Sequence, residues 1–116
     1  MAVRGVDTVF YKVTDLERSV TWYRDVLGIH PGPRYGDWQI LVVGGEVTFA
    51  LHRFDDPHPG VNAVVALAVE DLNAVIDHAA AVGVQPVDAE VTRTDDMLFV
   101  TYGDPDGNHI QLIQHL

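Results

Sequence analysis

The sequence contains the same short pattern twice. The first copy reads Val-Thr-Asp-Leu at 13–16 and Leu-Gly-Ile at 27–29, with a helix-like stretch between them. The second reads Val-Glu-Asp-Leu at 69–72 and Val-Gly-Val at 82–84. Their aspartates, Asp15 and Asp71, lie 56 positions apart in a chain of 116 residues. This repetition predicts two copies of one structural unit, so a site built by one copy should have a counterpart in the other.

The length of the chain favours one domain, residues 1–116, that contains both units. The polar segment Asp-Asp-Pro-His-Pro-Gly at 55–60 is the natural boundary between them. Module one then covers about residues 5–56, and module two covers about residues 60–116. Each module has the order β-α-β-β-β, which predicts an α+β domain.

Alternating and helical apolar periods predict the positions of the elements. In module one, strands are expected at 7–13, near 35–43 and at 46–54, with a helix that begins after Asp15 and ends at Gly28. Pro31-Gly32-Pro33 is interpreted as a connection. In module two, strands are expected at 62–69, 87–92, 97–102 and 109–114, with a helix over 71–82.

Composition excludes several classes of function. The net charge is −10, with 7 basic and 17 acidic residues, so the surface would repel a phosphate backbone, and nucleic-acid binding is not expected. No apolar run approaches the ~18 residues that span a bilayer, and the N-terminus lacks the pattern of a secretion signal. The chain has no cysteine, so thiolate sites and disulfides are excluded. We therefore expect a cytoplasmic protein that does not bind membranes.

Two longer segments carry a resemblance to a known family. They are Val-Thr-Asp-Leu-Glu-Arg-Ser-Val-Thr-Trp-Tyr-Arg-Asp-Val-Leu-Gly at 13–28 and Asp-Pro-Asp-Gly-Asn-His-Ile-Gln-Leu-Ile at 104–113. With this order of elements, the chain resembles the vicinal oxygen chelate superfamily, which includes glyoxalase I, extradiol dioxygenases and bleomycin-resistance proteins. The resemblance implies two βαβββ modules that form a curved mixed sheet around a central cavity, often in a homodimer. It does not identify an activity, because this fold hosts several chemistries.

The same resemblance implies where a metal ion would be bound. In the metal-dependent members, four cavity positions hold mostly His and Glu; here they correspond to Thr8, Ala50, Val64 and Gln111. Alanine and valine have no donor atom, and a neutral threonine hydroxyl is a poor ligand for a divalent cation. A catalytic metal site normally needs about three protein ligands. We therefore predict that no metal or other cofactor is bound at these positions.

Two histidines could provide other chemistry on the same face. His52 and His109 are each two residues from a cavity position, so alternation places both on the cavity side with Gln111. They could form a displaced metal site with Gln111, act as a general base, or simply be polar groups at the cavity mouth. The sequence leaves these alternatives open.

The other residues expected in the cavity are aromatic or apolar, and they suit a flat or cationic organic ligand. We therefore predict a metal-free protein that binds a small organic molecule, similar to the bleomycin-resistance branch. The rivals are an enzyme of the lyase, isomerase or dioxygenase type and a regulatory module that binds another protein. The expected ligand-binding residues are Thr8, Phe10, Trp38, Ala50, His52, Val64, Phe99, His109 and Gln111.

Overall fold

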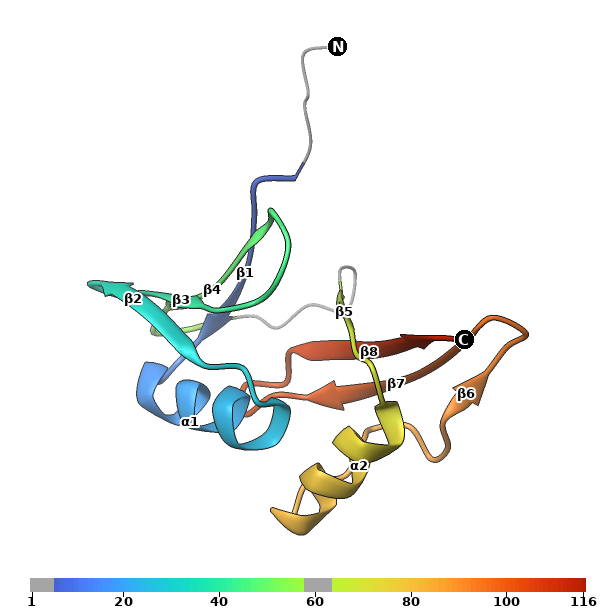
Figure 1. Ribbon diagram of the computed structural model, residues 1–116. Coiled ribbons are helices and arrows are strands. Elements are labelled where there is room, and N and C mark those ends of the chain that lie inside the picture. Colours follow the sequence, from blue (N-terminus) through green and yellow to red (C-terminus); the bar gives the residue numbers. More distant parts are fainter. Residues whose placement is uncertain (1–5, 58–63) are drawn as a thin grey trace.

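The computed structural model describes residues 6–57 and 64–116, and it contains the predicted unit twice (Figure 1). The first unit consists of β1 (Thr8–Val13), α1 (Leu16–Leu27), β2 (Pro31–Tyr35), β3 (Trp38–Leu41) and β4 (Thr48–Arg53). The second consists of β5 (Val65–Ala68), α2 (Leu72–Ala81), β6 (Thr92–Arg93), β7 (Met97–Gly103) and β8 (His109–His115). The predicted α+β class and the βαβββ order are confirmed.

Each unit forms its own four-stranded mixed sheet. The strand orders are β1-β4-β3-β2 and β5-β8-β7-β6, so the two sheets have the same topology. In each sheet the first strand pairs in parallel with the last strand of its unit, and the other pairs are antiparallel. The parallel pair is possible because a helix connects β1 or β5 to the next strand. The strands β1 and β5 are therefore the inner edges of two open sheets.

The repeated aspartates are helix caps. The carboxylate of Asp15 accepts a hydrogen bond from the Arg18 backbone N–H at 3.1 Å, and Asp71 accepts one from Ala74 at 3.1 Å. Each bond satisfies an N–H group that the first turn of a helix leaves without a partner. Gly28 ends α1 with a φ of 70°, the left-handed conformation that glycine adopts without strain. The repeat thus has a structural origin at these positions.

Two strand predictions were wrong. β2 includes Pro31 and Pro33, which we interpreted as a connection, and a turn at Gly36-Asp37 divides the expected strand 35–43 into parts of β2 and β3. Proline is tolerated there because β2 is an edge strand and needs fewer N–H donors. In module two, β6 contains only Thr92 and Arg93, so most of the expected strand 87–92 is irregular.

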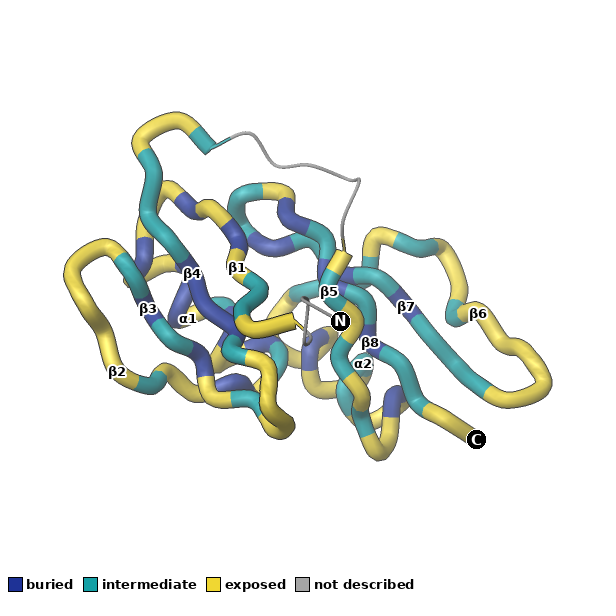
Figure 2. The backbone as a smooth tube through the Cα atoms, turned by 90° about the horizontal axis from the view of Figure 1, so that it is seen from above, coloured by how far each residue is buried: buried dark blue, intermediate teal, exposed yellow. Residues whose placement is uncertain are grey.

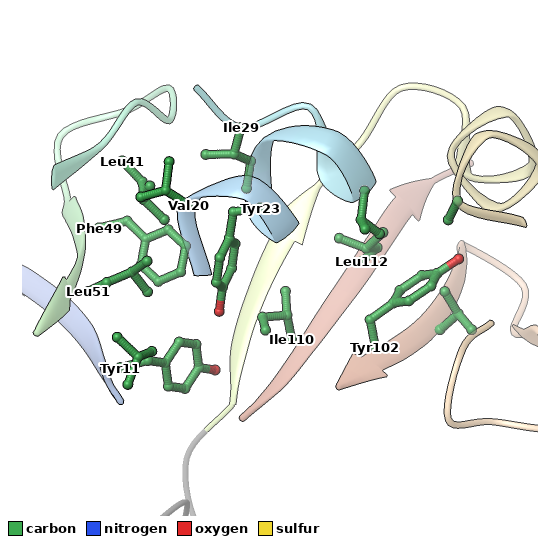
Figure 3. Close-up of a cluster of buried hydrophobic side chains, with 14 of the residues drawn as sticks. Tyr11, Val20, Tyr23, Ile29, Leu41, Phe49, Leu51, Tyr102, Ile110 and Leu112 are labelled. Carbon is green, nitrogen blue, oxygen red and sulfur yellow. The ribbon is translucent and has the colours of Figure 1, made fainter. Parts of the chain in front are cut away.

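One buried cluster connects the two units. The helix α1 packs against the first sheet through Val20 and Tyr23, and the same cluster includes Ile110 and Leu112 of β8 (Figure 3). Figure 2 shows that the outer edge strands β2 and β6 are largely exposed, whereas buried residues lie on the strands between them. None of the helices within residues 6–57 and 64–116 has the length and apolarity that a membrane span needs.

Polar contacts join β1 to the second unit. The Tyr11 hydroxyl donates a hydrogen bond to the His109 carbonyl and accepts one from the Val65 N–H at 2.9 Å. The Asn108 side-chain amide donates to the Lys12 carbonyl at 3.1 Å. A single phenol therefore satisfies one backbone group of β5 and one of β8, and it holds β1 beside both strands.

A second connection involves buried groups of α1 and the turn before β8. The Tyr23 hydroxyl donates to the Asp104 carboxylate at 3.0 Å, and the Asn108 N–H donates to the same carboxylate at 2.8 Å. Burial, together with the neighbouring charge of Asp104, raises the pKa of Tyr23 well above its ordinary value. Burial also raises the pKa of Asp104, against the effect of its hydrogen bonds from Asn108 and Tyr23.

We expect Tyr11→Phe to destabilise the fold by about 1–3 kcal/mol, because it leaves two partly buried backbone groups without a partner. The free energy of unfolding from urea titration measures this effect. Tyr35→Phe is the matched control, since Tyr35 is 65% exposed on β2 and should change stability by less than about 0.5 kcal/mol. Equal stabilities of the two variants would show that the Tyr11 bridge contributes nothing.

Stability should also fall at alkaline pH. The folded-state pKa of Tyr23 lies above the unfolded value of about 10, so its contribution is complete below about pH 10 and is lost as the pH rises further. Urea titrations from about pH 8 to 11 would measure this decline. Tyr23→Phe should be less stable at neutral pH but should lose less stability on going to pH 11. A decline as steep as that of the wild type would contradict this assignment.

Candidate functional site

Side-chain alternation divides each sheet into a helix-facing side and an opposite side, which we call the open face. In the first sheet, Tyr11, Val13, Phe49 and Leu51 are buried in the core with α1. Their neighbours along the strands therefore lie on the open face. Figure 1 shows both helices on the same side of the sheets, away from this face. The open face of the first sheet carries Thr8, Phe10, Lys12, Trp38, Ala50 and His52.

Four rings gather on the open face of the first sheet, and we call them the aromatic cluster: Phe10, Trp38, His52 and Phe54. The Phe10 and Trp38 centroids are 5.1 Å apart, and those of Trp38 and His52 are 5.4 Å apart. His52 lies 4.6 Å from Phe54. All these contacts are edge-to-face, an arrangement that stabilises aromatic pairs. Phe10 remains 43% exposed, so the cluster can make further contacts.

A lysine that the sequence analysis did not select belongs to the same face. The Lys12 ammonium lies over the Phe54 ring, 4.8 Å from its centroid. Lys12 is also the register partner of His52 across the β1–β4 pair. The signal was present in the sequence, because the alternation that places Thr8 and Phe10 on one face also places Lys12 there.

The open face of the second sheet is less aromatic than that of the first. Val100, Tyr102, Ile110 and Leu112 are buried on its helix side. The opposite side carries the predicted residues Phe99, His109 and Gln111, together with Ala66 and Thr101, which flank Gln111 in the register. Phe99 lies opposite Ile113 and is partly buried. The aromatic character is thus concentrated in module one.

A cavity of about 540 Å³ lies between the inner edges of the two sheets. It is lined by residues 9–11 of β1, by residues 64–68 at β5, and by Val43, Val47 and Phe49. Of the predicted site residues, Phe10 and Val64 contribute to this lining. Val64 is 44% exposed. The cavity is apolar, and the polar residues of the predicted site lie on the open faces to either side of it.

The two histidines lie on opposite sides of one strand. His52 is the register partner of Lys12 in the β1–β4 pair. The backbone carbonyl of His109 accepts a hydrogen bond from the Tyr11 hydroxyl of β1. The end of β1 therefore lies between them. His52 packs in the aromatic cluster, and its ring is 5.9 Å from Phe10.

The residues at the four inherited metal positions do not fit a divalent ion. Ala50 is fully buried between its register partners Phe10 and Ile40, and Val64 has no donor atom. The Thr8 hydroxyl is engaged by the Asp7 carboxylate. Gln111 is then the single good donor among the four, fewer than the three that a catalytic site normally uses. Within residues 6–57 and 64–116, no group of three or more His, Asp or Glu side chains could hold a metal ion.

Solved structures share this architecture over the whole chain. A putative glyoxalase family protein from Bacillus anthracis superposes with a TM-score of 0.82 at 16% identity, covering 100% of this chain and 98% of its own. A virulence protein from Salmonella typhimurium gives 0.78 at 23% identity, covering 100% of both chains. An antibiotic-binding protein from Streptomyces sp. CB03234 gives 0.79 at 23% identity, covering 100% of this chain and 99% of its own.

These identities establish the fold and leave the activity open. Among functionally curated proteins, none matches the sequence. The family assignment comes from the sequence itself, because residues 5–112 match the family described as Glyoxalase/Bleomycin resistance protein/Dioxygenase superfamily. That match covers both repeated units and confirms the resemblance found in the two motifs. The chain therefore belongs to the Glyoxalase/Bleomycin resistance protein/Dioxygenase superfamily.

Proposed function

We propose that this protein binds a small planar organic molecule on the open face of the first sheet and in the adjoining cavity. The observation that carries the proposal is the aromatic cluster, whose exposed member Phe10 also lines the cavity. Aromatic walls beside an apolar cavity of about 540 Å³ are typical of sites for small organic ligands. The antibiotic-binding neighbour from Streptomyces supports this kind of function for the fold.

We propose further that binding does not involve a metal at the inherited positions. The support is the chemistry of the residues there, with Ala50 buried and Val64 unable to coordinate. Gln111 and the second open face would instead orient a polar group of the ligand. Under this proposal the protein sequesters its ligand, and Thr8, His52, His109 and Phe99 contribute contacts from the two faces.

A homodimer is part of the proposal. Phe10 and Val64 are large apolar side chains that remain 43% and 44% exposed beside the cavity. In a homodimer, which the family resemblance implies, a second copy of the chain would shield the cavity and a ligand bound against Phe10 from solvent. Burying such apolar surface stabilises an association in proportion to its area.

The role of the aromatic cluster can be tested with a panel of planar aromatic compounds. Ligand-observed NMR would select the tightest binder, and calorimetry would give its dissociation constant. Trp38→Ala should weaken binding by about tenfold or more, because it removes a stacking surface from the centre of the cluster. Trp22→Ala on α1 is the matched control and should bind normally. Equal affinities for wild type and Trp38→Ala would refute this placement of the ligand.

Metal content separates the proposal from its enzymatic rival. Protein purified without chelators should contain much less than one equivalent of zinc, nickel, manganese or iron by mass spectrometry, because Gln111 alone cannot retain an ion. Extensive dialysis against a chelator should then leave ligand affinity unchanged. Stoichiometric metal, or affinity lost on chelation, would favour a relocated site at His52 and His109 and an enzyme of the lyase, isomerase or dioxygenase type.

A further inference from the structure

Lys12 differs from most basic residues of the chain in what its charge contacts. Arg18, Arg24, Arg34 and Arg53 each form an ion pair with a carboxylate. Within the described residues, Lys12 has no carboxylate partner, and its ammonium lies over the Phe54 ring instead. The chain has a net charge of −10, so carboxylates outnumber basic groups, yet this ammonium on the open face is not paired with one of them in the described residues. It leaves the charge available to a bound molecule.

The contacts of β1 place further hydrogen-bond donors at the same end of the strand. His52 is the register partner of Lys12. On the other side, Asn108 donates to the Lys12 carbonyl and the Tyr11 hydroxyl reaches the His109 carbonyl. Lys12 and His52 thus lie side by side where β1 ends, with the backbone of His109 on the other side of the strand, and we call this pair the donor end. Nearer the beginning of β1, Phe10 lines the apolar cavity together with Val64.

Aromatic walls suit both flat and cationic ligands, so they leave the charge of the ligand open. The ammonium of Lys12 at the donor end indicates that charge. A cationic group at the donor end would be repelled by Lys12, whose ammonium already uses the face of Phe54. An anionic oxygen would gain a charge-assisted hydrogen bond there. Charges on the acidic surface are screened beyond about 8 Å at physiological ionic strength, whereas an oxygen bound at the donor end would contact Lys12 directly.

We propose that the ligand is an aromatic anion: a planar ring system that carries a carboxylate or phenolate group. Its ring stacks on Phe10 and Trp38, and its anionic oxygen is bound by Lys12 with His52 as an additional donor. This inference rests on the proposed binding function and adds the charge and the orientation of the ligand. It also assigns Lys12 as a specificity-determining residue.

Three compounds with the same ring test the charge separately from the stacking. They are 2-naphthoate, the neutral 2-naphthamide and the cationic 2-naphthylmethylammonium, each measured by calorimetry at pH 7.5 and fixed ionic strength. We expect 2-naphthoate to bind about tenfold more tightly than the amide and the cation to bind most weakly, since one charge-assisted bond contributes about that factor. Lys12→Met should reduce 2-naphthoate to the affinity of the amide and should leave the amide unchanged.

Two further variants control for folding and for overall charge. Lys12→Arg keeps the positive charge and should retain the preference for 2-naphthoate. Arg93→Met removes an exposed charge on β6 and should bind all three compounds as the wild type does. Circular dichroism would verify that each variant is folded.

Each possible result has a distinct meaning. If all three compounds bind equally and Lys12→Met changes nothing, the aromatic anion is wrong although the aromatic cluster still binds rings. If the cation binds best, the inference is overturned in favour of a cationic ligand. If none of the three binds to the wild type, both this inference and the proposed planar-ligand function fail.

Discussion

The structure depends on the packing of one helix against two sheets. The buried side of α1 uses Val20 and Tyr23, and it draws Phe49 of the first sheet and Ile110 of the second into one cluster. Because side chains alternate along a strand, every residue committed to this core places its neighbours on the open face. The proposed ligand site is therefore a consequence of the core: once Tyr11 and Leu51 are buried, Phe10 and His52 face outward together.

The connection between the two units holds the two open faces beside one cavity, as the proposed site requires. Tyr11 belongs to the core of module one, yet its hydroxyl contacts the backbone of both β5 and β8. The inner edges of the two sheets are thus held beside each other, with a cavity between them. In module one the proposed site has the aromatic cluster, and in module two it has Phe99, His109 and Gln111 with the smaller Ala66 and Thr101 beside Gln111. The two copies share one arrangement of strands and helix, and the side chains that differ between them determine the chemistry of the proposed site.

Much of this arrangement could be predicted from the sequence, because it depends on local periodicity. The caps Asp15 and Asp71, the faces of β1 and β8, and the family were all readable from pattern and spacing. β2 was not predicted, because proline has a low propensity for strands, although an edge strand tolerates it. The facing of Trp38 and Phe99 depends on strand register, which tertiary pairing decides. Lys12 was overlooked because a charged residue on a strand is usually interpreted as solvated.

The loss of metal donors gives the site a different physical basis from that of its metal-dependent relatives. In place of a bound ion, the proposed site offers ring faces and one lysine. Stacking is tolerant of ring identity, so specificity must come from the donor end and from the shape of the cavity. We therefore expect the protein to select its ligand by charge and planarity.

Intermolecular nuclear Overhauser effects between a bound planar ligand and the protein would identify the side chains that contact the ligand. If the ligand lies on the aromatic cluster, cross-peaks should connect the ligand ring protons to the Trp38 indole and the Phe10 ring, with the ligand saturating at one site per chain. Cross-peaks to Trp22 and to the groove between α1 and α2, with none to Trp38 or Phe10, would show that the ligand binds on the helical side and would contradict this placement.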